Sequence, residues 1–132
     1  MVRYLLDTNA VIGLLNGSAP VLTRRVRRVA PAEIGVSSIV VYELFYGAYK
    51  SARVARNLAI IDGIQLQTLE FDREDARQAG ATRAALEKRG TPIGAYDILI
   101  AGQALARGLT LISRNLREFE CIEGLSVRNW EG

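Results

Sequence analysis

Short apolar runs alternate with longer amphipathic segments along most of this chain. The runs are too uniformly apolar to keep one face in water, which is typical of strands that are buried on both faces of a parallel sheet. Turn residues and charged positions bound each run. The predicted strands cover residues 2–6, 34–36, 64–69, 109–112 and 125–127.

The intervening segments carry apolar residues at helical spacing and are bounded by residues that cap helices. Asp7-Thr8-Asn9 offers N-caps to a first helix, which Gly17 ends, and Ser18 starts a second, basic helix. The later helices are predicted from Ser37 or Ser38 to about Tyr49, over residues 52–61, from Asp72 through Lys88, and over residues 94–107, with Gly108 closing the last.

Strands that alternate with helices predict an α/β fold. We expect a three-layer α/β/α sandwich with a central, mainly parallel sheet of four to five strands. The chain of 132 residues shows no internal repeat, low-complexity tract or interdomain linker. It is therefore interpreted as a single domain spanning residues 1–132.

Two scarce residue types narrow the classes of possible function. The chain has no histidine, which excludes histidine as a general base, a nucleophile or a metal ligand. Cys121 is the only cysteine, so neither an internal disulfide nor a structural zinc site can form. If the protein is an enzyme, carboxylates must carry its chemistry, and an oxygen-bound cation would accompany them.

Charge and hydropathy indicate where the protein works. The sequence reaches Asp7 before an apolar signal segment could form, and Glu43, Asp97 or Arg107 interrupts the apolar runs elsewhere. We therefore expect a cytoplasmic protein that does not enter a membrane. The net charge of +3 and a pI of about 9.3 fit an anionic partner such as RNA, although proteins with other partners share these values.

Three carboxylates stand at unusual places in the pattern. Asp7 follows a buried strand, where ligands bind parallel sheets, although a simple N-cap would explain it as well. Glu43 lies inside the apolar run of residues 39–46, so the alternatives are a functional acid or a rim residue paired with an arginine. Asp97 lies in the first turn of its helix, where the helix dipole stabilises an acidic residue. Alternatively it is a functional acid that faces the core, because apolar residues follow it on the same helix face at i+3, i+4 and i+7.

Further polar residues follow the predicted strand at residues 109–112. Ser113 and Asn115 come first, and Glu118 lies one helical turn later. Turn chemistry explains the first two, and a solvated surface charge explains Glu118. If these side chains converge with the three carboxylates, the site would suit Mg²⁺ or Mn²⁺ and phosphodiester hydrolysis.

Four motifs occur along the chain in a fixed order: residues 5–9 (LLDTN), 38–44, 95–101 (AYDILIA) and 111–115 (LISRN). The ending Arg117-Glu118-Phe119, Gly124-Leu125 and Asn129-Trp130 continues the pattern. In this order and spacing they resemble the PIN-domain family, most closely the VapC toxins of toxin–antitoxin systems. The resemblance covers essentially the whole chain and implies a PIN-like α/β/α sandwich with an acidic pocket at one end.

The resemblance also implies roles for individual residues. Asp7, Glu43 and Asp97 match the metal-binding carboxylates of the family. Thr8 and Ser113 match positions that support the site by hydrogen bonding. Where many members have a fourth acid this chain has Asn115, which leaves the second metal site open. The residues implied for catalysis are thus Asp7, Glu43 and Asp97, with Glu118 as the substitute for the fourth acid. Asn9 matches the residue that often follows the first Asp-Thr of the family.

The implied activity is endonucleolytic cleavage of RNA, in which metal-activated water attacks phosphorus and leaves a 5′-phosphate and a 3′-hydroxyl. In close VapC relatives the substrate is structured RNA, often initiator tRNA. The resemblance further implies a homodimer and a VapB-like antitoxin whose tail occupies the acidic pocket. Candidate phosphate-binding residues are Arg24, Arg25, Arg27, Arg28, Lys50, Arg53 and Arg56, of which those spread around one helix cannot all face RNA.

Two other enzyme classes and one non-enzymatic module are alternative interpretations of the sequence. A phosphatase of the haloacid-dehalogenase type needs a second Asp two residues after the first, where this chain has Asn9. A response-regulator receiver needs an Asp at the end of its third strand, and residues 66–70 offer none. A degenerate PIN module that only binds RNA or protein is the alternative outside enzymes, and Asn115 favours it.

Overall fold

The central sheet of the computed structural model, which describes residues 1–131, consists of five parallel strands. They are β1 (Tyr4–Leu6), β2 (Ile34–Ser37), β3 (Gln67–Leu69), β4 (Thr110–Ile112) and β5 (Ser126–Arg128). The strands are hydrogen-bonded in the order β3-β2-β1-β4-β5, and each neighbouring pair is parallel. The predicted α/β fold is confirmed, and the sheet is parallel throughout.

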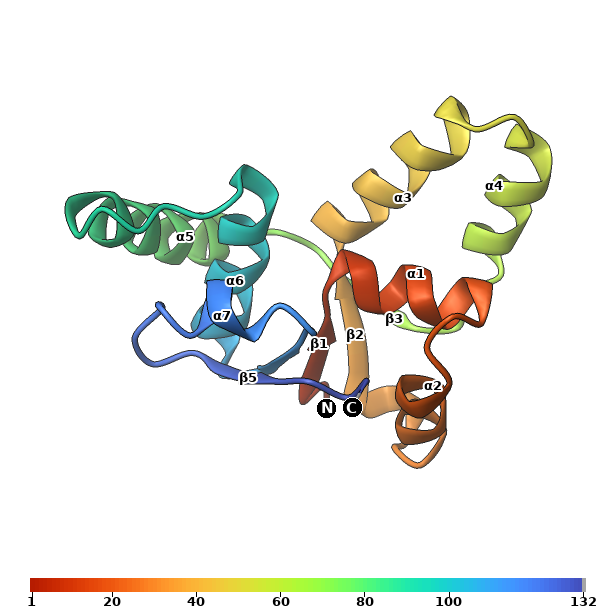
Figure 1. Cartoon of the computed structure of the whole chain (residues 1–132), viewed down its shortest axis with the longest axis horizontal. Coiled ribbons are helices and arrows are strands. Elements are labelled where there is room, and N and C mark those ends of the chain that lie inside the picture. Colours follow the sequence, from red (N-terminus) through yellow and green to blue (C-terminus); the bar gives the residue numbers. More distant parts are fainter. Residues whose placement is uncertain (132) are drawn as a thin grey trace.

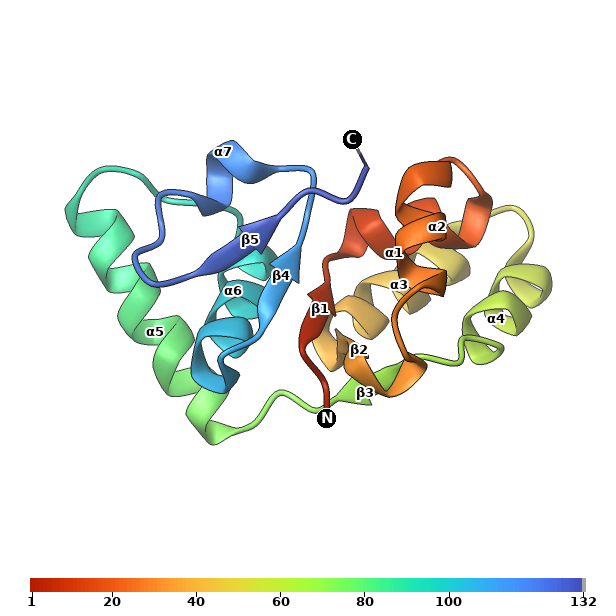
Figure 2. The ribbon, with the colours of Figure 1, turned by 90° about the horizontal axis from the view of Figure 1, so that it is seen from below.

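Helices cover the sheet on its two sides. In both views α5 and α6 lie on one side of β1, and α1 to α4 lie on the other (Figures 1 and 2). The helices are α1 (Thr8–Asn16), α2 (Pro20–Arg27), α3 (Ser38–Lys50), α4 (Val54–Asp62), α5 (Arg73–Lys88), α6 (Ala95–Arg107) and α7 (Leu116–Phe119), with a 3₁₀ turn, η1 (Pro31–Glu33), before β2. Among residues 1–131, no helix has the length and hydrophobicity that a membrane span requires.

The strand order places a topological switch point between β1 and β4. From β1 the chain moves outward through β2 to β3, and it then crosses to β4 on the other side of β1. In open parallel sheets, ligands bind beyond the carboxyl ends of strands at such a point. Asp7 follows β1 and Ser113 follows β4, so the two residues meet there.

Several boundaries differ from the sequence prediction, among them the start of the first strand, which is Tyr4 and not residue 2. The strand predicted over residues 64–69 begins only at Gln67, where pairing with β2 starts at Gly35. The second helix begins at Pro20 and not at Ser18, because proline is favoured in the first turn of a helix. The helix predicted from residue 52 begins at Val54, since Ser51 is still bonded to the end of α3.

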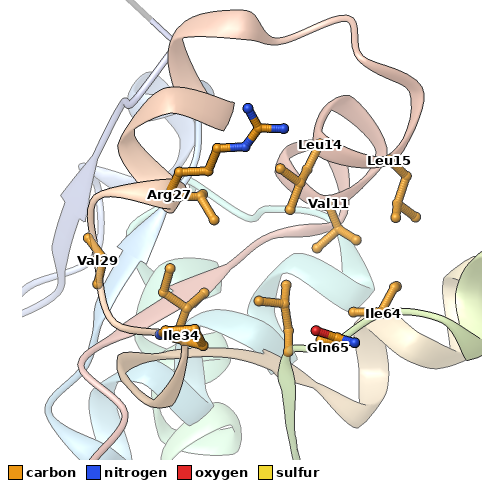
Figure 3. A pocket seen from close by; sticks show the side chains of 11 residues that line it. Val11, Leu14, Leu15, Arg27, Val29, Ile34, Ile64 and Gln65 are labelled. Atoms are coloured by element: carbon orange, nitrogen blue, oxygen red, sulfur yellow. The ribbon is translucent and has the colours of Figure 1, made fainter.

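The residues just before β3 pack against the first two helices. Ile64 faces Val11 and Leu14 of α1 across an apolar cavity, beside which the guanidinium of Arg27 lies (Figure 3). The cavity has a volume of about 430 Å³. This packing explains why an apolar run that looked like a longer strand forms only a short one.

The three central strands supply the middle of the core. Their side chains are at most 1% exposed at Leu5, Leu6, Ile34, Val36, Leu111 and Ile112. Strands buried on both faces require apolar residues at successive positions, which is the pattern seen in the sequence. The rigid centre of the sheet thus lies directly beneath the polar residues that follow β1 and β4.

Helices α5 and α6 pack closely at Gly102. A Cβ atom at this position would lie 2.5 Å from the Cα and Cβ atoms of Ala79, which is far inside van der Waals contact. Only a residue without a side chain allows the two helices to approach in this way. Because α6 also carries Asp97, this contact helps to fix the position of the proposed site.

We expect Gly102→Ala to lower the free energy of unfolding by about 2–3 kcal/mol, because the added methyl group forces α5 and α6 apart. Gly80, in the same helix pair, has open space around its Cβ position. Gly80→Ala should therefore stabilise the protein by about 0.5–1 kcal/mol through helix propensity. Urea unfolding of both variants measures the difference, and equal effects would contradict the proposed close packing.

Candidate active site

Asp7 lies at the junction of β1, β4 and α1. Its backbone amide donates to the carbonyl of Ile112, 3.1 Å away, and its Oδ1 accepts from the amide of Ala10 at 2.8 Å. The residue is therefore the N-cap of α1, as one alternative predicted, and it is only 4% exposed. Burial raises the pKa of this carboxyl, against the opposite effects of the Ser113 side chain and the Ala10 amide.

Glu43 is half-buried on α3 and is oriented by a hydroxyl group. The Oγ1 of Thr8 donates to its Oε1 at 2.8 Å. This contact agrees with the supporting role predicted for Thr8. The rim pairing with an arginine is not seen, since no ion pair within residues 1–131 includes Glu43.

Asp97 and Glu118 form an interacting pair of acids. The amide of Gly94 donates to Oε1 of Glu118 at 3.1 Å, and the side-chain amide of Asn115 donates to its other oxygen. Glu118 is thus half-buried and held at two points, and its side chain is not simply solvated. Asn115 is therefore a hydrogen-bonding partner of Glu118. The sequence analysis had left open which of these two residues completes the site.

The charges of the other three acids act on Asp97. The pKa of Asp97 is raised to about 7, first by burial, then by the charge and hydrogen bond of Glu118, and then by the charges of Asp7 and Glu43. Ser113, which is 1% exposed, accepts from the amide of Asn115 at 3.0 Å and so shapes the loop after β4. Hydrogen bonds thus join Thr8 to Glu43 and Asn115 to Glu118.

Comparison with known proteins places this arrangement in a family. The sequence matches the PIN domain over residues 4–124. The chain belongs to the PIN-domain family. Its relatives include the tRNA(fMet)-specific endonuclease VapC of Salmonella typhimurium, 39% identical over 98% of this chain and 99% of that protein. Ribonuclease VapC2 of Haemophilus influenzae is 41% identical over the same shares.

Solved structures of VapC proteins have the same fold. The DNA-bound VapBC from Salmonella typhimurium matches with a TM-score of 0.93 and 39% identity, covering 98% of this chain and 99% of that one. VapBC2 from Rickettsia felis, bound to a DNA fragment from its promoter, matches with a TM-score of 0.91 and 33% identity over the same shares. The sequence prediction that this PIN domain is a toxin ribonuclease of the VapC type is thereby confirmed.

The donor atoms of the four acids suit a hard cation. These acids offer only oxygen, and none of them takes part in an ion pair within residues 1–131. In the same part of the chain, no three or more acidic or thiol side chains are placed so that they could hold a metal ion together. Mg²⁺ keeps several of its waters and needs few protein carboxylates, so the residues fit an ion that is held partly through water.

Two charged residues that act on Asp7 were missed by the sequence analysis. Arg114 lies 4.0 Å from the carboxylate of Glu131, and the charges of both residues act on Asp7. The C-terminal segment is held there by Trp130, which is 8% exposed and packs on Tyr4 with ring centroids 4.9 Å apart. The signal in the sequence was indirect: Trp130 belongs to the motif at the end of the chain, and Glu131 follows it.

Two of the predicted basic residues have contacts that show where they lie. The arginines of α2 are all exposed, and among them Arg25 donates to the carbonyl of Asn129 at 3.4 Å, beside the C-terminal segment. Arg56 lines a cavity of about 610 Å³ that Glu43 also lines. Arg56 therefore shares a cavity with one of the four acids.

Proposed function

We propose that this PIN domain is a metal-dependent endoribonuclease that uses Asp7, Glu43 and Asp97 to bind Mg²⁺ or Mn²⁺. The observation that carries the proposal is the raised pKa of Asp97, which comes from burial and from three neighbouring acids. Acids gathered without a cation repel one another, and such an arrangement is more typical of function than of structural support. Their position at the switch point between β1 and β4 favours the same interpretation.

The protein groups have separate tasks in this mechanism. Asp7 is held rigidly by the amide of Ala10, and Thr8 fixes the orientation of Glu43. When bound, the cation supplies a Lewis acid that neutralises the phosphate charge and activates a water molecule. The buried floor formed by β1 and β4 keeps the carboxylates in place, so little reorganisation is needed when RNA binds.

Glu118 takes the place of the fourth acid in the proposal. Its two oxygens are engaged by Gly94 and Asn115, and its charge acts directly on Asp97. We assign it the role of holding a proton or a water molecule beside Asp97, with Asn115 and Ser113 as its support. The neutral Asn115 therefore does not make the site a mere binding module.

Substrate and partners follow from the relatives named above. Since one of them is a tRNA(fMet)-specific endonuclease, we propose that this chain also cleaves a structured RNA such as initiator tRNA. The solved relatives occur in VapBC complexes, which supports a VapB-like antitoxin as the partner of this chain. A homodimer is part of the same proposal.

The test is an RNA cleavage assay with purified, antitoxin-free protein. We expect discrete cuts in total cellular RNA with Mg²⁺ or Mn²⁺, none with EDTA, and fragments that carry 5′-phosphate ends. Glu43→Gln should abolish the cuts, whereas Glu74→Gln, an exposed acid on α5, should keep them. Intact RNA in the presence of metal, combined with RNA binding that survives EDTA, would favour the non-catalytic module.

A further inference from the structure

Four tyrosines are exposed on one region of the molecule. Tyr42, Tyr46 and Tyr49 lie on α3 and Tyr96 lies on α6, with exposed fractions between 43% and 66%. Tyr42 directly precedes Glu43 in the sequence, and Tyr96 directly precedes Asp97. Two large rings therefore remain in water immediately beside the proposed metal-binding acids.

Tyr42 and Tyr96 form a defined pair. Their hydroxyl oxygens are 3.2 Å apart, at hydrogen-bond distance, and their ring centroids are 5.6 Å apart with an angle of 56° between the planes. The pair bridges α3 and α6, the helices that carry Glu43 and Asp97. Both rings are thus fixed relative to the acids, because the hydrogen bond and the ring contact restrict their rotation.

The charges around the pair indicate which ligand it suits. Tyr46, one turn away, already has the ammonium group of Lys50 over its ring at 5.6 Å. The Tyr42–Tyr96 pair has no such cation within residues 1–131, so its exposed faces are available for a flat, apolar group.

We infer that Tyr42 and Tyr96 bind an unpaired nucleobase of the RNA by stacking, next to the phosphate that is cleaved. The inference rests on the proposed function, because it is the carboxylate cluster that places a phosphodiester beside these rings. Unpaired RNA bases stack readily on aromatic side chains, and the contact tolerates different sequences. The pair thus positions a single-stranded nucleotide and favours cleavage in loops over cleavage in helices.

The test compares two labelled ligands with equal numbers of phosphates: fluorescein-labelled octaadenylate and an abasic ribose-phosphate octamer. Binding is measured by fluorescence anisotropy on Asp97→Asn protein, which should not cut them. Adding Tyr42→Ala and Tyr96→Ala together should weaken octaadenylate binding about tenfold or more. Binding of the abasic octamer should stay within about twofold, because it lacks the bases that stack.

Two further variants separate stacking from other roles. Tyr42→Phe with Tyr96→Phe should restore octaadenylate binding, since phenylalanine keeps the ring and loses only the hydroxyl. Tyr49→Ala removes an exposed ring further along α3 and should leave both affinities unchanged. Equal losses for the two ligands, or no loss for either, would overturn the inference.

The competing explanation is that a second copy of the chain covers these rings. Sedimentation velocity of the double alanine variant decides this, because dissociation of a dimer would assign the rings to that interface and overturn the stacking role. Failure of the proposed function has a different signature: wild-type protein would then leave RNA intact in the presence of metal, whether or not the tyrosine substitutions weaken octaadenylate binding. Cleavage by wild type with no tyrosine effect would overturn the stacking inference alone.

Discussion

Asp97→Asn is expected to lower the rate of RNA cleavage by roughly 10²–10³-fold or more while the protein remains folded. The substitution keeps the size of the side chain and removes the negative charge at the centre of the four acids. Quantitative cleavage of an initiator tRNA transcript with saturating Mg²⁺ measures the loss. Asp62→Asn, at an exposed position at the end of α4, is the matched control and should keep full activity.

The same substitution should stabilise the metal-free protein. The pKa of Asp97 in the folded state is about 7, above its ordinary value, so ionisation costs more in the folded than in the unfolded chain. This cost is absent below about pH 4 and complete above about pH 7. Since Asp97 is half-exposed, we expect Asp97→Asn to raise the free energy of unfolding in EDTA by about 1–2 kcal/mol at pH 8.

Added metal should reverse the order of stability. Wild type gains free energy from binding Mn²⁺ that grows with the logarithm of the free Mn²⁺ concentration above Kd, whereas Asp97→Asn has lost a ligand. Chemical unfolding of both proteins at pH 5 and pH 8, with EDTA and with Mn²⁺, provides the measurement. An equal gain from Mn²⁺ in the two proteins would show that the metal binds elsewhere, even if cleavage is lost.

The site was predictable because its acids break the hydrophobic pattern. Glu43 interrupts an apolar helix and Asp97 is followed by apolar residues on its own face, so each carboxylate stood out before its neighbours were known. The strands β1, β2 and β4 were found for the same reason, since both of their faces are buried. A resemblance to PIN domains then supplied the roles that spacing alone leaves open.

Contacts between distant segments were not predictable in this way. The strand order depends on how the helices pack against both sides of the sheet, which no local pattern records. Glu131 reaches Arg114 only because β5 pairs with β4 and brings the end of the chain beside the pocket. Asn115 was recognised as polar, but its hydrogen bond to Glu118 depends on the turn between Ser113 and α7.

Asp75 is the clearest buried acid that the sequence analysis missed. Asp72 was expected to cap α5, and the structure shows the full capping box, in which Asp75 accepts from the amide of Asp72 at 2.9 Å. Asp75 is 1% exposed, and it also accepts from Arg107 at 2.9 Å and from Gln103 at 3.1 Å. These partners lie on α6, so the cluster fixes the helix that carries Asp97.

We expect Asp75→Ala to lower the free energy of unfolding by about 3 kcal/mol, because it leaves the guanidinium of Arg107 without its buried partner. Glu74→Ala, at the exposed neighbouring position, should change the free energy of unfolding by less than about 0.5 kcal/mol. Urea unfolding at pH 7 measures both effects. A small effect of Asp75→Ala would mean that water replaces the carboxylate.

The contribution of Asp75 should also depend on pH in a definite direction. Burial raises its pKa, but the hydrogen bonds from Arg107, Asp72 and Gln103 outweigh burial, so the pKa in the folded state lies below its ordinary value. A lowered pKa stabilises the fold fully above about pH 4, and this stabilisation is lost as the pH falls further. Wild type should therefore lose stability more steeply than Asp75→Ala in acid, and parallel curves would contradict the assignment.

Because Asp75 touches none of the four acids, folded Asp75→Ala protein should still cleave RNA. This result would separate the anchoring of α6 from the chemistry at the start of that helix.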